Sequence, residues 1–375
     1  MGFGLGRRDV ADAPLGEDDA PFPSGATRLD DDGVAALLPD RPKRGHKGSF
    51  GKLLVLAGSL DYAGAALLVC RAAGRTGAGL VTLAVPESLQ PLFAAKVVEA
   101  TTMGLPEDDV EEIDPEPALA RILDHEHDAV VVGPGLRPGL ATTELVRLLL
   151  GGSADGDSAP LVLDAEALRS LATLDGWWEG EHRPAVLTPH AGEFARLRAG
   201  SGREPANDGD LAADDDARVA AATDAATTWN TVVVLKGART VIAAPDGTVA
   251  VAPFENPALA SGGTGDVLAG AIGSLLAQGL EPFAAARLGV YLHGVAGDAV
   301  RERFGDAGLL ASDLPDGLAI ARKRLAAVRE RKGGAKRVGF VTREGGTSET
   351  AVTAGPATGG SATGRPATTG SDRSR

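Results

Sequence analysis

Residues 261–266 read SGGTGD and run directly into the apolar stretch VLAGAI at residues 267–272. Three glycines leave backbone N–H groups uncovered, and the apolar stretch predicts the helix that those groups open. A helix N-terminus carries about half a positive charge, so such a loop is typical of a phosphate-binding cradle. Asp266 would repel a phosphate at that end unless it had a task, and accepting a proton from an attacking hydroxyl group is the obvious one. An ordinary helix start, capped by Thr264 or Asp266 behind flexible glycines, explains this stretch equally well.

Short apolar runs rich in β-branched residues alternate with Ala- and Leu-rich stretches in the chain before this loop. Strands covered on both faces have this nearly continuous apolar character. Their alternation with helices predicts an α/β fold with a mostly parallel, doubly wound sheet. A β-hairpin is predicted over residues 239–252, with its turn at Pro245-Asp246-Gly247. The six predicted strands are residues 52–57, 80–85, 129–132, 161–164, 185–188 and 231–235.

The composition allows one large α/β domain. The chain has 375 residues, of which 43% are hydrophobic, enough to build a full core. We expect this domain over residues 26–330, between disordered tails at residues 1–25 and 331–375 that are poor in apolar side chains. An acidic stretch at residues 201–216 is predicted to be a solvated loop before a helix, with metal binding as the less favoured alternative.

The charge and the cysteine content exclude several classes of protein. A net charge of −14 argues against broad binding to nucleic acid or to anionic membranes. The single cysteine, Cys70, excludes an intrachain disulfide. No leader-like segment and no apolar run of about 18 residues occur, so we expect a cytoplasmic protein with no membrane partner.

Polar or glycine-rich segments follow the predicted strands repeatedly. Ligands bind beyond the carboxyl ends of strands in open α/β sheets, so these segments together predict a binding crevice. Each residue also has an ordinary explanation: His190 could be a hydrogen-bonded loop residue, Lys236 could reach solvent, and Asp164 could cap the next helix. The segments are Gly58-Ser59, Gly133-Pro134-Gly135, Asp164 to Glu166, His190 to Glu193, Lys236 to Thr240 and residues 261–266.

Taken together and in this order, the motifs resemble those of the ADP-dependent NAD(P)H-hydrate dehydratases. They are HKGSFG at residues 46–51, GPGL at 133–136, LTPHAGEF at 187–194, LKGA at 235–238 and the segment from Asn256-Pro257 to Asp266. The resemblance covers about residues 27–324. That family has the ribokinase-like fold, so the resemblance implies a three-layer αβα architecture.

The resemblance also implies a reaction and the residues that carry it. ADP would phosphorylate the ring hydroxyl of the S-form of hydrated NADH or NADPH, and phosphate would then leave, giving NAD(P)H, AMP and phosphate. Asp266 would be the base. The implied contacts are Ala65, Gly135, His190 and Asp266 for the hydrated dinucleotide; Lys236, Gly237, Ala238, Arg239, Thr240 and Gly265 for ADP or AMP; and Gly263, Thr264 and Gly265 for the moving phosphoryl group. Lys47 for phosphate and Glu193 for a metal-bound water are weaker candidates.

Further expectations concern cofactors and partners. We expect Mg²⁺ on the diphosphate, held through water, with no direct metal ligand assigned. The family often carries a fused epimerase domain, for which we expect no room before Thr27, so a separate epimerase would act upstream. Relatives tend to form homo-oligomers, which we expect here as well.

Three residues depart from the family pattern, and other functions compete with the dehydratase. Arg137 and Glu255 stand where the family usually has glycine, and Glu166 stands where it tends to have aspartate. The main alternative is an ATP-dependent ribokinase-like kinase of a small alcohol, such as a hydroxymethylpyrimidine or a hydroxyethylthiazole. A nucleotide sensor without turnover is the second alternative, which the intact Asp266 disfavours.

Overall fold

The computed structural model of the protein describes residues 22–151, 159–202 and 214–335. Its main sheet has ten strands in the order β1-β12-β11-β10-β9-β8-β7-β2-β3-β4. The strands are β1 (Thr27–Arg28), β2 (Lys52–Leu56), β3 (Leu80–Pro86), β4 (Thr101–Leu105), β7 (Ala129–Val132), β8 (Leu161–Leu163), β9 (Ala185–Leu187), β10 (Val232–Leu235), β11 (Val241–Ala243) and β12 (Val249–Val251). A separate small hairpin pairs β5 (Glu107–Asp109) with β6 (Glu112–Ile113).

Of the described strands of the main sheet, β11 alone runs antiparallel to its neighbours. The predicted mostly parallel sheet and the predicted hairpin, formed by β11 and β12, are therefore confirmed. Along the chain the strands first run from β2 out to β4 and then return to the other side of β2, where β7 pairs. The β2/β7 boundary is thus the topological switch point of the sheet, and ligands of open α/β sheets typically bind at the carboxyl edge near such a point.

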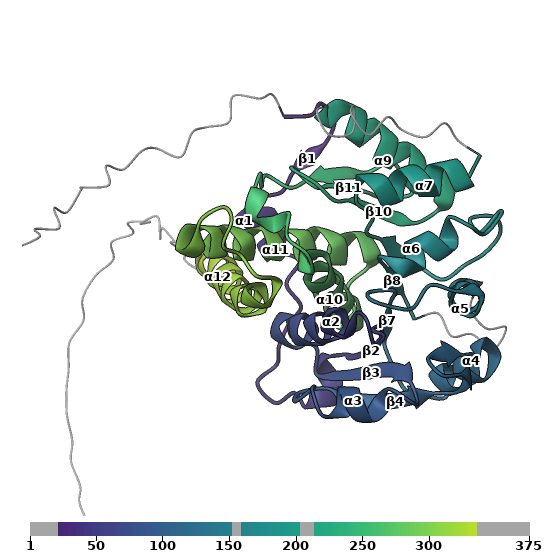
Figure 1. Ribbon diagram of the computed structural model, residues 1–375. Helices are drawn as coiled ribbons and strands as arrows, with labels where there is room; N and C mark the ends of the chain where they lie inside the picture. The colour runs from purple at the N-terminus through teal and green to yellow at the C-terminus, as the bar shows by residue number, and fades with distance from the viewer. Residues whose placement is uncertain (1–21, 152–158, 203–213, 336–375) are drawn as a thin grey trace, which may run out of the picture.

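Helices cover both faces of the sheet (Figure 1). Successive residues of a strand point to opposite faces, so Leu53 and Val55 join one apolar core while Leu54 and Leu56 join the other. The first core is completed by α1 (Asp31–Ala35), α2 (Ala63–Thr76), α3 (Gln90–Ala94), α10 (Thr264–Ala277), α11 (Pro282–Phe304) and α12 (Leu314–Ala335). The second is completed by α4 (Pro115–Leu123), α5 (Leu140–Gly151), α6 (Glu166–Leu171), α7 (Ala191–Gly200) and α9 (Asp215–Trp229). This is the expected three-layer αβα fold.

Helix α10 is buried almost all round, as its uniformly apolar sequence indicates. Two glycines allow its close approach: a Cβ on Gly273 would overlap the Val131 side chain of β7, and one on Gly270 would overlap the Val69 carbonyl of α2. The helix is therefore fixed between the sheet and α2. Its N-terminus, with the glycine loop, lies at the carboxyl edge of the sheet.

The other ordered segments complete this frame. Three short 3₁₀ turns occur in the described residues: η1 (Lys47–Phe50), η2 (Pro257–Leu259) and η3 (Ala311–Asp313). The C-terminal helix α12 continues to Ala335, past the expected end of the domain at residue 330. The predicted tails at residues 1–21 and 336–375, and residues 203–213 of the acidic stretch, lie outside the described residues. In the rest of that stretch, Asp214 caps α9 by accepting a hydrogen bond from the Ala217 N–H over 3.1 Å.

None of the helices in the described part of the chain is long and apolar enough to cross a membrane.

Candidate active site

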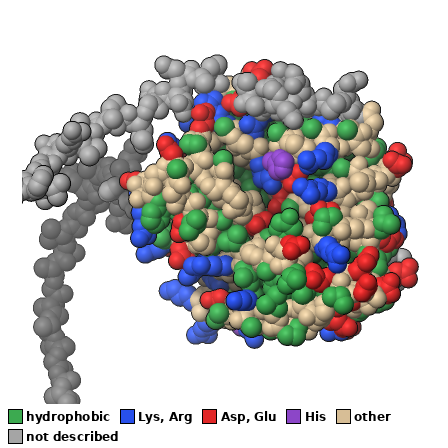
Figure 2. All heavy atoms as spheres, in the orientation of Figure 1, with side chains coloured by type: hydrophobic (Ala, Val, Ile, Leu, Met, Phe, Trp, Pro, Cys, Tyr) green, Lys and Arg blue, Asp and Glu red, His purple; other side chains and the backbone are tan. Residues whose placement is uncertain are grey.

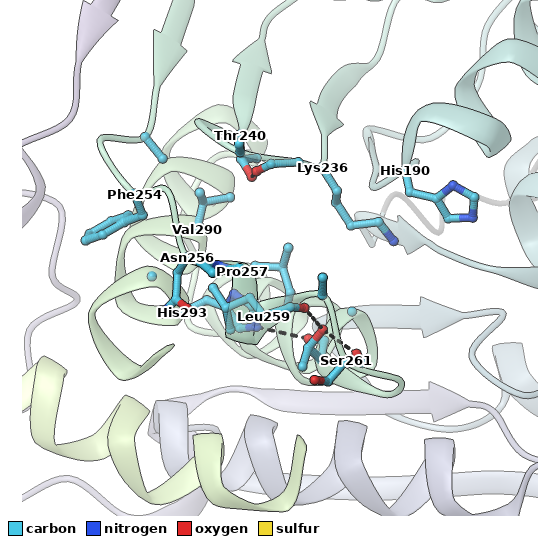
Figure 3. A pocket seen from close by; sticks show the side chains of 18 of the residues that line it. His190, Lys236, Thr240, Phe254, Asn256, Pro257, Leu259, Ser261, Val290 and His293 are labelled. Carbon is cyan, nitrogen blue, oxygen red and sulfur yellow. Dashed lines mark hydrogen bonds between the residues drawn. The ribbon is translucent and has the colours of Figure 1, made fainter. Parts of the chain in front are cut away.

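A pocket of about 830 Å³ opens at the carboxyl edge of the sheet. It lies between the loops that follow β10 and β12 and the N-terminus of α10. Lys236 and His190 come from neighbouring strand ends on one side of it, while Phe254, Val290 and His293 line the other side (Figure 3). Residues that line it and were predicted as site residues are His190, Lys236, Gly237, Ala238, Thr240, Gly263, Thr264, Gly265 and Asp266.

Lys236 is held inside the pocket by carboxylates. Its Nζ donates to Asp164 Oδ1 over 2.7 Å and lies 3.7 Å from Glu193 Oε2. The Asp164 side chain is 2% exposed, and its Oδ1 also accepts a hydrogen bond from the Thr188 hydroxyl over 2.8 Å. Lys236 therefore does not reach out to solvent, and Asp164 does not cap the following helix. The two residues form a buried ion pair across the ends of β10 and β8.

The glycine loop presents backbone rather than side chains to this pair. Gly265 stands so close that a Cβ there would lie 3.4 Å from Lys236 Nζ, and glycine therefore leaves the ammonium group uncovered. The Thr264 hydroxyl turns back toward the carbonyls of Leu259 and Ser261, at 2.7 and 2.9 Å, which share its single proton. No side chain caps α10, whose N-cap is Gly263. The alternative of an ordinary capped helix start is thus not what the structure shows.

The N–H groups of this first turn point toward the pocket end of α10. Those of Gly265 and Asp266 precede the first hydrogen bond of the helix, which runs from Val267 N to Gly263 O over 3.3 Å. The Thr264 N–H makes a long bond of 3.4 Å to the Ser261 carbonyl. The turn is therefore a concave set of donors at the positive end of a helix, which suits an anion.

Asp266 is the residue of the pocket whose pKa bears most directly on its chemistry. Burial, together with the charges of Asp164 and Glu193 and against the opposing effect of Lys236, raises the pKa of its carboxyl group to about 7. A base works best when its pKa lies near the working pH. Asp266 can therefore take up and release a proton at neutral pH, beside the donors of the glycine loop.

His190 and Glu193 form the start of α7. His190 Nδ1 accepts a hydrogen bond from the Gly192 N–H over 3.1 Å, and Glu193 Oε2 accepts one from the His190 N–H over 2.9 Å. Glu193 is thus the first-turn carboxylate of its helix, and it also lies beside Lys236. The imidazole of His190 remains half exposed at the rim of the pocket.

The far wall of the pocket is apolar and was not predicted. Phe254, Leu259, Leu268 and Val290 supply it. Buried His293 joins this wall to the glycine loop by donating from Nε2 to the Thr264 carbonyl over 3.0 Å. Burial lowers the pKa of His293 to about 4, so its ring is neutral at pH 7. Apolar residues in a helix or after a strand look like core in the sequence, so no signal separates these from ordinary packing.

Five predicted residues do not line this pocket, and one of them, Glu193, lies directly behind Lys236. Ala65 and Gly135 meet at the switch point instead, where a Cβ on Gly135 would lie 2.9 Å from the Ala65 Cβ. Arg239 is buried under its own loop. Lys47 is exposed in η1, immediately before β2, and so lies at the amino edge of the sheet, away from the pocket. The structure therefore does not bring Lys47 to this site.

The residues that depart from the family pattern have local partners. Glu255 pairs with Nε of Arg239, whose backbone is left-handed (φ 50°) and whose Nη1 lies 3.3 Å from Asp215. Glu166 lies 3.7 Å from Arg169, and burial raises the pKa of its carboxyl group. Arg137 donates to the Val110 carbonyl over 3.3 Å on the surface.

The carboxylates of the pocket bear on the expected metal. Within residues 22–151, 159–202 and 214–335, no three His, Cys, Asp or Glu side chains converge on a complete metal site. Mg²⁺ needs less than this, because it keeps several waters and is completed by substrate phosphates. Asp164 and Glu193 supply the oxygen ligands that this ion prefers, and the adjacent anion cradle supplies room for phosphate. The donor set therefore fits a magnesium ion held through water.

The fold and the site define a class of protein. A largely parallel sheet between helix layers, with a glycine loop and a lone carboxylate at the start of a buried helix, is the ribokinase-like arrangement. A ribokinase-like superfamily protein from Enterococcus faecalis has this fold, with a TM-score of 0.66 at 24% identity over 82% of this chain and 98% of that one.

Sequence comparison is more specific. The profile of the NAD(P)H-hydrate dehydratases matches residues 53–319. The ADP-dependent (S)-NAD(P)H-hydrate dehydratase of Bacillus subtilis is 36% identical over 293 residues, which is 78% of this chain and 96% of that protein. A crystal structure of the Bacillus subtilis ADP/ATP-dependent enzyme, co-crystallised with ATP and Mg²⁺, has a TM-score of 0.67 at 33% identity, covering 80% of this chain and 99% of that one. The chain belongs to the NAD(P)H-hydrate dehydratase family.

A longer relative matches as well. The bifunctional NAD(P)H-hydrate repair enzyme of Moorella thermoacetica is 43% identical over 291 residues, which is 77% of this chain and 52% of that protein. The chain spans about half the length of such bifunctional relatives.

Proposed function

We propose that the protein catalyses the ADP-dependent dehydration of the S-form of hydrated NADH or NADPH, giving NAD(P)H, AMP and phosphate. The observation that carries this proposal is the Asp266 carboxyl group, with its pKa near 7, beside the donors of the glycine loop and within the field of Lys236. The membership of the family supports the choice of substrate. The protein would then act in metabolite repair in the cytoplasm.

In the first step, Asp266 takes the proton of the ring hydroxyl as its oxygen attacks the β-phosphorus of ADP. The new O–P bond forms while the bond between phosphorus and the bridging oxygen breaks, and AMP leaves. N–H groups at Gly263, Thr264 and Gly265 bind the phosphoryl oxygens, and Lys236 offsets their negative charge. The protein contributes mainly alignment and charge neutralisation, as in other phosphoryl transfers.

In the second step, the phosphate ester leaves. Hydroxide is a poor leaving group and phosphate is a good one, so phosphorylation makes elimination possible. The lone pair of the ring nitrogen expels phosphate, and loss of a proton from the neighbouring ring carbon restores the double bond. Burial of the pocket floor excludes water from the cation formed in between.

The two substrates would occupy neighbouring parts of the carboxyl edge. We assign AMP to the loop Lys236 to Thr240 and the apolar wall, with Gly265 at its phosphates. The hydrated ring would reach Asp266 from the switch-point side, in contact with Ala65, Gly135 and His190. Asp164 and Glu193 would hold Mg²⁺ through water, and the bound ion would neutralise the diphosphate.

The partners follow from the same chemistry. Small molecules are the expected ligands, and nucleic acid and membranes are not. We propose a homo-oligomer, and a separate NAD(P)H-hydrate epimerase that would supply the S-form upstream.

The decisive experiment incubates the pure full-length chain with hydrated NADH, ADP and Mg²⁺ and follows the near-ultraviolet absorbance of reduced nicotinamide. We expect that absorbance to return in step with AMP formation. No recovery of absorbance, together with ATP-dependent phosphorylation of a hydroxymethylpyrimidine or a hydroxyethylthiazole, would instead establish the kinase.

A further inference from the structure

A second pocket, of about 370 Å³, lies between the C-terminal end of α2 and the helix α12. The chain leaves α2 here to enter β3, so this pocket is at the amino edge of the sheet, opposite the candidate active site. Of the described residues that line it, none is acidic and five are cationic: Arg41, Arg75, Arg322, Lys323 and Arg329. Lys and Arg side chains also gather along the lower-left margin of Figure 2, beside α12 and α2. Such a cluster is unusual in a chain with a net charge of −14.

Two of the guanidinium groups converge on one point. Arg41 Nη1 donates to the Gly77 carbonyl over 2.9 Å, and Arg322 Nη1 donates to the Thr76 carbonyl. Both Nη1 atoms lie 2.8 Å from the position that a Cβ of Gly77 would take. A larger residue at this position would push both guanidinium groups aside, and the two like charges are neighbours across Gly77.

Capping of α2 does not account for the cluster. Arginine side chains do bind the last carbonyls of helices, and Arg41 and Arg322 each use one N–H group in this way. A guanidinium has five N–H donors, so most of the donors of this pair remain for another acceptor. Lys323 takes no part in the cap. Burial, together with the charges of Arg41 and Arg329, lowers the pKa of Arg322 to about 10, so its charged form is disfavoured at this position.

The nearby acids balance only part of the charge. Asp316 lies 2.9 Å from Arg75 Nε and is half exposed, and Asp40 lies 3.2 Å from Arg329 Nη1 and is 94% exposed. Exposed pairs of this kind contribute little. Among the described residues, the three other cations of the pocket, Arg41, Arg322 and Lys323, form no ion pair with a carboxylate.

We propose that this amino-edge pocket binds a small anion that carries phosphate groups. Guanidinium forks match phosphate oxygens in a bidentate manner, and a lysine on the rim adds a mobile charge. The volume admits one or two phosphate groups with their waters. The ligand would relieve the repulsion among the arginines, and neither its binding nor its test depends on the proposed dehydratase activity.

Calorimetric titration of the full chain with inorganic diphosphate at low ionic strength tests this proposal. The informative variants are Lys323→Gln, which removes an exposed amine and leaves the cap intact, and the double variant Arg41→Gln/Lys323→Gln. The control is Arg331→Gln, the same charge change on the same helix outside this pocket. Diphosphate bound at the glycine loop is common to all four proteins, so the difference between them reports the amino-edge pocket.

We expect the wild-type chain and Arg331→Gln to bind alike, more weakly as salt is added. The double variant should lose one bound diphosphate per chain or weaken its binding roughly tenfold or more, the size expected for a lost charge-assisted hydrogen bond. Lys323→Gln should show a smaller loss in the same direction. The proposal is wrong if the double variant binds as many diphosphate ions, with the same affinity, as the wild-type chain, including the case in which neither binds any.

Discussion

The two edges of the sheet carry opposite excesses of charge. At the carboxyl edge, one ammonium group, that of Lys236, is surrounded by the carboxyl groups of Asp164, Glu193 and Asp266. At the amino edge, arginines gather in a pocket whose wall, in the described part of the chain, contains no acidic residue. In each place the charge in excess has a shifted protonation equilibrium: the pKa of Asp266 is raised to about 7, and that of Arg322 is lowered to about 10.

The sign of the excess charge decides whether an edge can exchange a proton near neutral pH or can only attract an anion. An excess carboxylate next to a lysine can exchange a proton near neutral pH, which is useful in a reaction. An arginine keeps its proton at neutral pH even when its pKa is lowered, so an excess of arginines can only attract negative charge. Substituting one of the carboxylates at the carboxyl edge and one of the cations at the amino edge tests this comparison.

The largest effect is expected from Asp266→Asn. Asparagine keeps the shape but cannot accept the proton, so turnover of hydrated NADH should fall by about 10²- to 10⁴-fold. The spectrophotometric assay measures this loss, with Asp246→Asn in the exposed hairpin turn as the matched control. Unchanged activity in Asp266→Asn would mean that the excess carboxylate at the carboxyl edge is not the base.

The same variant should have a pH-dependent effect on stability. The folded-state pKa of Asp266, about 7, lies above its ordinary value of 3.8, so the wild-type chain is penalised as pH rises and the carboxyl group must ionise. Asp266→Asn should gain stability over the wild type between about pH 4 and pH 7, by at most roughly 4 kcal/mol, with no further gain above pH 7. Urea unfolding at a series of pH values measures the difference. If the difference in the free energy of unfolding between Asp266→Asn and the wild type did not change with pH, the pKa of Asp266 would not be raised in the folded chain.

Much of the fold could be predicted because buried parallel strands appear in the sequence as nearly continuous apolar runs. All six predicted strands are present, since runs such as Val130 to Val132 are apolar on both faces. The missed strand β4 lies at the edge of the sheet, begins with two threonines and has an exposed end, so no continuous apolar run marks it. The missed β1 has only two residues.

The candidate sites differ more sharply in what the sequence reveals. The glycine loop, Lys236 and His190 were predicted to converge because each follows a strand or opens a helix at one edge. Phe254 and Val290 were not predicted, because their role depends on which apolar residues face a pocket. The amino-edge cluster was missed because Arg41, Arg75 and Arg322 come from separate segments, and each alone looks like an ordinary surface charge.

A smaller effect on activity is expected from changing an ion pair at the carboxyl edge, in which positive and negative charges balance. Glu255 pairs with Arg239 and thereby joins the loop after β12 to the loop assigned to AMP. Glu255→Gln leaves Arg239, whose side chain is 8% exposed, with Asp215 as its remaining carboxylate partner among the described residues. We expect the KM for ADP to rise about three- to tenfold with kcat nearly unchanged, since the loop is loosened but the base is intact. Glu302→Gln, at the exposed C-terminal end of α11, is the control, and a fall in kcat without a change in KM would contradict this role.

The smallest effect is expected from two lysines on α12, one with cationic neighbours and one with an acidic neighbour. Lys323 stands among arginines, whereas Lys332, also on α12, lies 2.7 Å from Asp32. Lys323→Gln should therefore raise the free energy of unfolding at low salt, by less than about 0.5 kcal/mol, and Lys332→Gln should leave it unchanged or lower it. High salt should erase both differences, because screening removes repulsion and attraction alike. Urea unfolding at two ionic strengths measures them, and a loss of stability in Lys323→Gln equal to that in Lys332→Gln would show that the amino-edge charges do not repel one another.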